Sequence, residues 1–257
     1  MLIAIDIGNT NIKYGVFDGD ELVASFRVSS RISRTSDEYG SVLVGLLNSR
    51  NIKASDISDI IFSSVIPSLN YTMCHMCEFF FGITPLIIGP GVKTGLNIRT
   101  DNTKEVGADI IVNSVSAFNK YGGPVVVIDF GTATTFDVIN EKAELVGVVI
   151  APGVKTSLEG LATKTAQLPM VELDAPKTVI GKNTKHWMQS GIIFGFAGLV
   201  DNIIRKIKAE LGVKEIKVIA TGGLGEIIAK ESKSITLVDR TLTLDGLKVI
   251  YELNRKN

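Results

Sequence analysis

The chain has 257 residues, of which 45% are hydrophobic and 21% are charged, as is usual for a globular protein. Its 27 Lys and Arg residues balance 27 Asp and Glu residues, so the net charge gives no general attraction to nucleic acid or to an anionic membrane. We predict no apolar run long enough to span a bilayer, and an N-terminal strand instead of a signal peptide. A cytoplasmic protein that binds neither nucleic acid nor membrane is therefore expected.

The first half of the chain predicts strands alternating with helices. Strands are expected at residues 2–5, 13–17 and 21–28, followed by a helix over 36–47, a strand over 59–64, a helix over 68–81 and a strand over 85–88. A polar loop follows and extends to residue 103, and loops of that length are often functional. A helix is expected over 105–118. This order indicates an α/β fold.

The second half opens in the same way. Three strands are expected at 124–128, 134–139 and 144–150, then helices over 156–165 and 185–211, a strand over 217–220 and a terminal helix over 243–254. Gly191, Gly195 and Gly198 share one face of the long helix. That face predicts either a close helix or subunit contact, or only a flexible helix that breaks near Gly195 or Gly198.

Two short motifs are repeated about half a chain apart, at residues 6 and 129. Each follows an apolar run and has an aspartate, a glycine and a threonine in that order before the chain becomes apolar again. The glycine allows a sharp turn, and the small polar residues after it can hold phosphate oxygens. Each motif therefore predicts a hairpin that binds phosphate, with an acid able to reach a metal ion directly or through water. The alternative for either motif alone is an ordinary turn.

Other residues gave weaker indications. Asp109 lies in the first turns of its predicted helix, where an acid stays ionised and can accept a proton, or simply stabilises the helix end. Cys74 and Cys77 form a Cys-x-x-Cys pair. Because no second ligand pair accompanies them, reduced, buried cysteines are preferred to a zinc site.

Nearly the whole chain resembles the type III pantothenate kinases, within the actin, sugar kinase and heat-shock ATPase superfamily. The matching stretches are 6–13, 63–67, 101–102, 105–109, 129–135, 151–153, 181–184, 221–223 and 242–247. The resemblance implies two actin-like (ribonuclease H-like) lobes built from duplicated β-β-β-α-β-α units, with a nucleotide cleft between them. The lobes are expected at residues 1–118 and 119–257, with the alternative that the terminal helix packs back on the first lobe.

The same resemblance implies ATP-dependent phosphorylation of pantothenate to 4′-phosphopantothenate, the first step of coenzyme A biosynthesis. Asp109 would be the catalytic base. A magnesium ion would accompany ATP, with Asp6 near it through water, and Asp129 would hold a monovalent cation, potassium or ammonium. The ATP-binding residues would be Asp6, Ile7, Gly8, Asn9, Thr10, Asn11, Ile12, Lys13, Gly131 and Thr132. The pantothenate-binding residues would be Thr100, Gly107, Ala108, Asp109, Ile110 and Thr184. Thr184 would reach the neighbouring subunit's site, which implies a homodimer.

Two positions depart from the family's pattern. The family has an arginine where Ile110 stands and tends to have a tyrosine where Thr100 stands. Both changes fall on the substrate side. Two alternatives therefore remain, a non-catalytic nucleotide-binding paralogue with a regulatory role resembling a transcriptional activator, and a kinase for another small alcohol.

Overall fold

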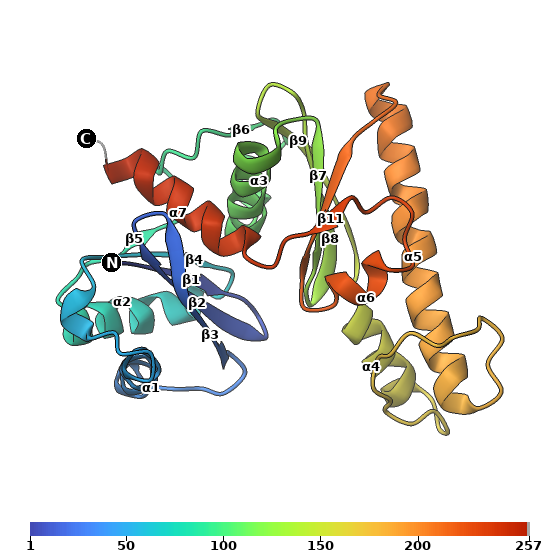
Figure 1. The fold of residues 1–257 in the computed structure, drawn as a ribbon, viewed down its shortest axis with the longest axis horizontal. Helices are drawn as coiled ribbons and strands as arrows, with labels where there is room; N and C mark the ends of the chain where they lie inside the picture. Colours follow the sequence, from blue (N-terminus) through green and yellow to red (C-terminus); the bar gives the residue numbers. More distant parts are fainter. Residues whose placement is uncertain (256–257) are drawn as a thin grey trace. The chain divides into compact units, whose positions relative to one another are not determined.

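The computed structural model describes residues 1–255, which form two compact units (Figure 1). The first unit consists of residues 1–96, 101–116 and the C-terminal residues from 242, and the second consists of residues 97–100 and 117–241. The C-terminal helix thus belongs to the first unit, although it follows the second in sequence. The lobe boundary that we predicted from the sequence, between residues 118 and 119, stays a prediction.

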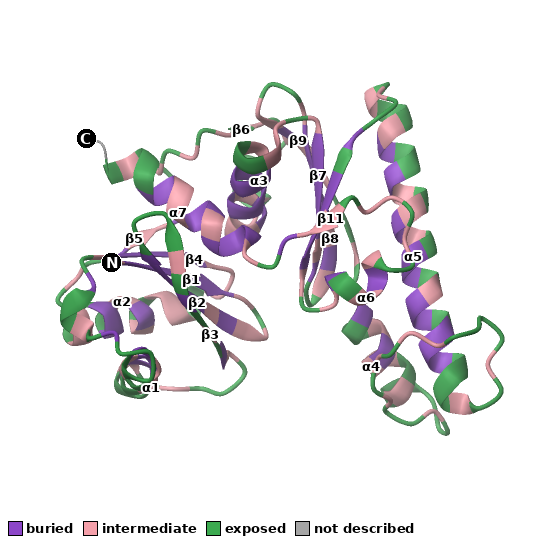
Figure 2. Ribbon diagram, viewed as in Figure 1, coloured by how far each residue is buried: buried purple, intermediate pink, exposed green. Residues whose placement is uncertain are grey.

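The first unit contains a five-stranded sheet in the order β3-β2-β1-β4-β5. Its strands are β1 (Leu2–Ile7), β2 (Asn11–Asp18), β3 (Glu21–Ser29), β4 (Asp59–Ser64) and β5 (Leu86–Ile87). β1, β2 and β3 pair antiparallel, whereas β4 is parallel to β1 and β5 is parallel to β4. β1 is buried along its whole length (Figure 2), so the acid near its end is fixed by the core of the unit.

Helices cover both faces of this sheet. α1 (Ser36–Asn48) and α2 (Pro67–Phe81) pack on the face that carries Ile3, Ile5 and Ile7. α3 (Ala108–Tyr121) and α7 (Leu242–Arg255) pack on the face that carries Leu2 and Ala4. The same alternation of the β1 side chains leaves Asp6 on the α3 and α7 side. Two short 3₁₀ turns, Ala54–Asp56 and Thr103–Glu105, complete this unit.

The second unit contains a six-stranded sheet in the order β11-β10-β7-β8-β9-β6. Its strands are β6 (Asn97–Ile98), β7 (Val125–Phe130), β8 (Ala133–Ile139), β9 (Glu144–Pro152), β10 (Lys217–Gly222) and β11 (Leu237–Val238). β7, β8 and β9 pair antiparallel, and β10 is parallel to β7. Apart from β6, this order repeats that of the first sheet. The duplication predicted from the two motifs is therefore a duplication of topology.

The helices of the second unit are α4 (Val154–Lys164), α5 (Thr184–Leu211) and α6 (Gly225–Ala229). Their buried residues pack with β7, β8 and β10 in one hydrophobic core. α5 runs unbroken through Gly195 and Gly198, so the predicted break is wrong. By length and composition alone α5 could also cross a membrane, contrary to our prediction that no run was long enough, but half of its apolar window is buried inside the structure.

Several boundaries differ from the sequence prediction. α3 begins at Ala108, because residues 103–105 form a 3₁₀ turn and not its first turn. α1 is capped by Thr35, whose side chain accepts from the Glu38 N–H while Glu38 reaches back. The short elements β6, α6 and β11 were not predicted, since two to five residues carry too little periodicity to recognise.

The cysteine pair is part of the first core. Cys77 is buried, Cys74 is half-buried, and both are free thiols. Burial raises the pKa of Cys77 to about 12, so its thiol stays protonated. The prediction of reduced cysteines holds, although only one of them is fully buried.

Candidate active site

The first hairpin joins β1 to β2 through a tight turn. The Gly8 N–H donates to the Asn11 carbonyl at 3.0 Å, and a side chain at Gly8 would come within 3.2 Å of that oxygen. β3 holds the turn from the side: the Ser30 N–H donates to the Thr10 carbonyl at 3.1 Å, and the Ser30 hydroxyl donates to the Gly8 carbonyl at 2.7 Å. The tip of the hairpin is thus a fixed loop.

Asp6 lies at the base of this hairpin and is buried. It is directly opposite Lys13 on β2 and opposite Ser63 on β4. Its carboxylate accepts from the Ser63 hydroxyl at 3.1 Å and lies 3.3 Å from the Lys13 Nζ. Asp6 is buried whereas Lys13 is partly exposed, so removing Lys13 would leave the Asp6 charge without compensation inside the protein. Asp6 and Lys13 are therefore held as a unit.

Asp109 occupies the first turn of α3. Its carboxylate accepts from the Ile110 N–H at 2.9 Å. Burial raises the pKa of Asp109 above its ordinary value, and the nearby carboxylate of Asp6 raises it further, while backbone hydrogen bonds and Lys13 act in the opposite direction. A carboxyl group with a raised pKa beside an acid and a cation is the usual environment of a general base.

Gly107 makes room for that carboxylate. A side chain at Gly107 would begin 2.4 Å from the Asp109 Oδ1, closer than any real contact. The next residue, Ile110, is buried and packs inward. The position where the family has an arginine thus carries apolar surface inside the first unit. Arg99, which follows β6 in the second unit, has its guanidinium paired with the Glu144 carboxylate at 2.9 Å.

The second hairpin joins β7 to β8 by a related turn. The Gly131 N–H donates to the Ala133 carbonyl at 3.0 Å. Behind it, the Thr156 hydroxyl donates to the Thr132 carbonyl at 2.7 Å. α4 therefore supports the tip of this hairpin, a role for Thr156 that the sequence did not reveal.

Asp129 stands where Asp6 stands in the first unit, and it is directly opposite Thr221 on β10. Gly222, with a φ of +88°, lies against it: a side chain there would begin 2.6 Å from the Asp129 Oδ1. Left-handed backbone and this close approach both require glycine. The sequence had marked Gly222 as part of a third loop, but not as a neighbour of Asp129.

The remaining predicted substrate residues lie in the second unit. The Thr100 hydroxyl, just after β6, is buried and has no hydrogen-bond partner within the described chain. Thr184 is the first residue of α5, behind an Asn183 cap whose side chain accepts from the His186 N–H at 3.0 Å. The structure thus groups Asp6, Lys13 and Asp109 in the first unit. It groups Asp129 and the second hairpin in the other.

The carboxylates of the site fit a metal ion whose coordination shell is completed mainly by a bound ligand. Within residues 1–255 no three His, Cys, Asp or Glu residues are grouped so that they could hold a metal ion. Magnesium in phosphoryl-transfer sites usually takes one or two carboxylates and completes its shell with phosphates and water. Asp6 and Asp129 are single carboxylates of this kind.

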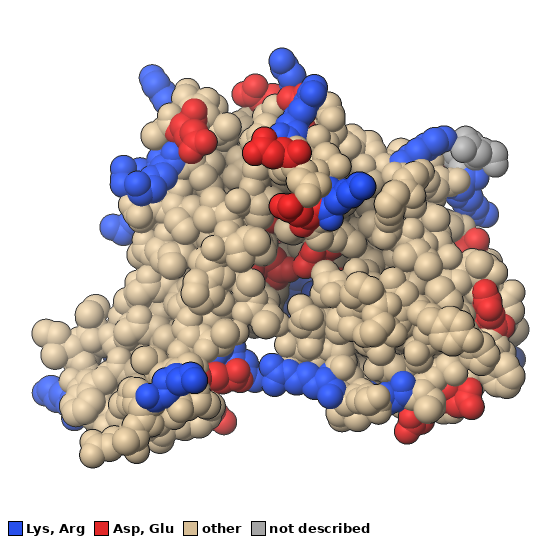
Figure 3. Space-filling model, turned by 180° about the vertical axis from the view of Figure 1, so that it is seen from behind, with Lys and Arg blue, Asp and Glu red and all other residues tan. Residues whose placement is uncertain are grey.

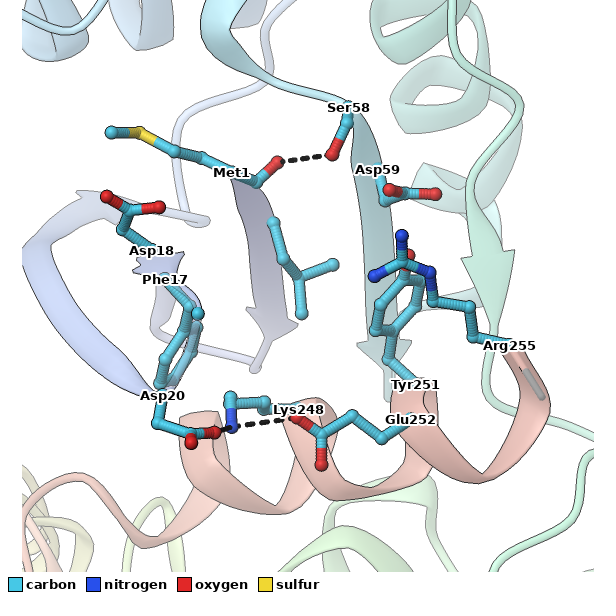
Figure 4. A pocket seen from close by; sticks show the side chains of 12 residues that line it. Met1, Phe17, Asp18, Asp20, Ser58, Asp59, Lys248, Tyr251, Glu252 and Arg255 are labelled. Carbon is cyan, nitrogen blue, oxygen red and sulfur yellow. Dashed lines mark hydrogen bonds and ion pairs between the residues drawn. The ribbon is translucent and has the colours of Figure 1, made fainter.

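A separate pocket of the first unit lies at the other end of the strands. It has a volume of about 200 Å³, is open to solvent, and is lined by residues such as Leu2, Asp59 and Tyr251 (Figure 4). Lys248, which also lines it, pairs with Asp20 at 2.5 Å and with Glu252 at 2.8 Å. It contains none of the predicted site residues, and Asp6 lies at the opposite end of β1 from this pocket.

The surface charges are mixed. On the face shown in Figure 3, Lys and Arg side chains are interspersed with Asp and Glu side chains. This agrees with the equal numbers of acidic and basic residues.

The chain also matches a known protein family. The family model of the type III pantothenate kinases matches residues 2–206. That range contains every residue predicted for the site.

Solved structures with similar folds share little sequence with this chain. One, described as a conserved Baf family transcriptional activator from Campylobacter jejuni, is 19% identical with a TM-score of 0.61, covering 99% of this chain and 100% of its own. A protein described as a 2-dehydro-3-deoxygalactonokinase from Sinorhizobium meliloti is 12% identical with a TM-score of 0.61, covering 100% and 98%. The ethanolamine utilization protein EutJ from Carboxydothermus hydrogenoformans is 13% identical with a TM-score of 0.57, covering 96% and 89%. At these identities the likeness concerns the fold, which is the actin-like α/β fold of sugar kinases.

Proposed function

Since this chain belongs to the type III pantothenate kinase family, we propose that it transfers the γ-phosphoryl group of ATP to the 4′-hydroxyl of pantothenate. The product is 4′-phosphopantothenate, and the reaction opens coenzyme A biosynthesis in the cytoplasm. The observation that carries the proposal is the placement of Asp109, with its raised pKa, close to the buried Asp6 and Lys13 pair.

In this proposal the two hairpins bind nucleotide phosphates. The turn at Gly8 and the turn at Gly131 present backbone N–H groups and small polar side chains to phosphate oxygens. Lys13 offsets charge on the transferred group, and phosphoryl transfer depends mainly on such positioning and charge stabilisation. Magnesium, when bound, neutralises phosphate charge, and Asp6 and Asp129 are the carboxylates that would hold cations, a monovalent one at Asp129.

Asp109 acts as the base. It accepts the proton of the pantothenate hydroxyl as the oxygen attacks the γ-phosphorus, and the β–γ bridging oxygen leaves with ADP. Burial that raises the pKa of Asp109 makes the carboxylate a stronger base than a solvated aspartate. Gly107 and Ala108, which carry little side chain, leave room for the substrate beside it.

A homodimer completes the proposed site. Gly191, Gly195 and Gly198 are exposed along one face of α5, and a side chain built at any of them meets nothing within 4 Å. This face can receive a second copy of the chain, with Thr184 at the start of the same helix contributing to the partner's substrate site. Neither nucleic acid nor membrane is part of the proposal.

A second candidate is a regulatory paralogue that binds nucleotide without turnover. The buried Ile110 in place of the family's arginine favours it, because the substrate side lacks a charge-assisted hydrogen bond. One of the similar structures is described as a transcriptional activator, which gives this candidate a precedent in the fold.

A coupled ADP-release assay decides between these functions. We expect pantothenate-dependent ADP release from the wild type, and a loss of about 10²–10⁴-fold in turnover for Asp109→Asn with ATP affinity unchanged. Release with another small alcohol but not with pantothenate would assign a different substrate. ATP binding without release for any alcohol would favour the regulatory paralogue.

A further inference from the structure

Arg27 is a cation on the site face of the first sheet for which the proposed reaction has no role. It lies on β3 directly opposite Lys13 of β2, and Lys13 is directly opposite Asp6 of β1. Directly opposed residues of neighbouring strands point to the same face of a sheet. Arg27, Lys13, Asp6 and Ser63 therefore form one row across four strands, and the contacts of Asp6 with Ser63 and Lys13 confirm the orientation of these three residues.

The charge of Arg27 is not compensated. Lys13 is paired with Asp6, whereas Arg27 is exposed and makes no ion pair within the described residues. Like charges directly opposite one another on a sheet repel, so the Arg27 and Lys13 pair favours a bound anion. The residues that share this face next to the pair on β2 and β3 bear amide or hydroxyl groups or no side chain: Asn11, Gly15, Ser25 and Ser29.

Arg27 is also fixed relative to the first hairpin. Ser30, three residues further along the chain, holds the hairpin tip through its bonds to the Thr10 and Gly8 carbonyls. The strand that carries Arg27 and the turn proposed to bind phosphate are thus joined. An arginine on this strand can offer two parallel donors of its guanidinium to a phosphate group.

The order of residues in the row indicates which anion Arg27 meets. Asp6 lies on one side of Lys13 and Arg27 lies on the other. In the proposed reaction the alcohol faces Asp109, which is near enough to Asp6 for their charges to interact. An anion at Arg27 is therefore separated from the alcohol by Lys13, which is proposed to bind the nucleotide phosphates.

We propose that Arg27 is a further phosphate-binding residue, which contacts a phosphate oxygen of ATP beside Lys13. This inference rests on the proposed kinase function and adds β3 to the two hairpins as a nucleotide-binding element of the first unit.

The test compares Arg27→Gln and Arg27→Lys with Arg50→Gln. Arg50 is an equally exposed arginine that follows α1, on an element remote from the row, so its variant controls for the loss of one charge. Binding of ATP and of adenosine is measured by calorimetry with magnesium present, together with KM for pantothenate. We expect Arg27→Gln to weaken ATP binding by about tenfold to a hundredfold, the range of one charge-assisted hydrogen bond. Adenosine affinity and KM for pantothenate should stay constant, and Arg27→Lys should recover part of the loss.

Two results would overturn the inference. One is an ATP affinity of Arg27→Gln equal to that of Arg50→Gln, and the other is a loss that falls on adenosine or on pantothenate instead of on ATP. A wild type that binds ATP without phosphorylating pantothenate contradicts the proposed function, while the comparison of the Arg27 variants still decides this inference.

Discussion

At the scale of single residues, opposing effects of its surroundings determine the pKa of Asp109. Burial and the Asp6 carboxylate favour its protonated form, while its backbone hydrogen bonds and Lys13 favour the ionised form. The balance leaves its pKa above the ordinary value of 3.8. Only the ionised form accepts a proton from the substrate, so the raised pKa sets the acid limit of the proposed reaction.

The pH dependence of kcat/KM should report this shift, because kcat/KM reflects the ionisation of the free enzyme. As pH falls through the raised pKa, Asp109 becomes protonated and kcat/KM should decline, at a higher pH than a solvated aspartate would produce. Because the folded pKa exceeds the unfolded one, ionising Asp109 also lowers the free energy of unfolding as pH rises through the same window. A pH profile of kcat/KM for pantothenate measures the first effect. An acid limb centred at or below 3.8 would contradict the assignment of Asp109.

Gly222 and Gly223 form a matched pair of adjacent glycines. Ala at 222 requires a positive φ and places a methyl group against Asp129 and the Phe130 carbonyl, whereas Ala at 223 meets nothing within 4 Å. We expect Gly222→Ala to lower the free energy of unfolding by about 1–3 kcal/mol. Gly223→Ala should change it by less than about 0.5 kcal/mol. Urea denaturation of both variants checks this, and equal effects would show that the approach to Asp129 is not tight.

At the scale of elements, α5 has two faces with different roles. One face supplies buried residues to the core of the second unit, among them Ile193, Val200 and Ile204. The other carries the three exposed glycines, which cost helix stability, and a side chain built at any of them would meet nothing within 4 Å among residues 1–255. The proposed dimer would use this face of small residues for close contact.

Substituting this face should change the oligomeric state. Gly195→Leu adds a side chain where the proposed dimer needs close contact, so sedimentation should shift from dimer toward monomer and turnover should fall. Gly45→Leu, at an exposed glycine of α1 with equally open space, is the control. Both changes gain helix propensity, about 1 kcal/mol each, so a lower monomer stability is not expected. A Gly195→Leu protein that remains dimeric and fully active would show that the glycine face is not the interface.

At the scale of the whole molecule, nucleotide binding should be visible as stability. A ligand that binds only the folded chain at 100 times its Kd adds about 2.7 kcal/mol to the free energy of unfolding. Since each hairpin is proposed to bind nucleotide phosphates, ATP should protect the sheet from which that hairpin extends.

Asp129→Ala tests whether a monovalent cation held by Asp129 contributes to the stabilisation by ATP. We expect the wild type to gain more thermal protection from ATP with magnesium when potassium or ammonium is added, and Asp129→Ala to lose this response and bind ATP more weakly. Thermal unfolding with and without each salt is the measurement, with sodium as the reference salt. An unchanged potassium response would contradict the assignment of a monovalent cation to Asp129.

The sequence alone predicted the α/β class, the duplicated hairpins and the family, because these depend on local patterns that the chain displays in order. Buried runs alternate with turn residues, and the motifs at Asp6 and Asp129 each occupy only a few consecutive positions. It could not predict which residues meet across strands or between distant segments. The row from Arg27 to Ser63 and the close approach of Gly222 to Asp129 arise from strand register and packing. The sequence offered the return of the terminal helix to the first lobe only as an alternative, and in the structure α7 belongs to the first unit. Such contacts join residues as distant as Asp20 and Lys248, which are 228 positions apart, and no local pattern encodes them. The buried side chain of Ile110 shows the same division: its departure from the family was visible in the sequence, but only the tertiary structure decided that it faces the core.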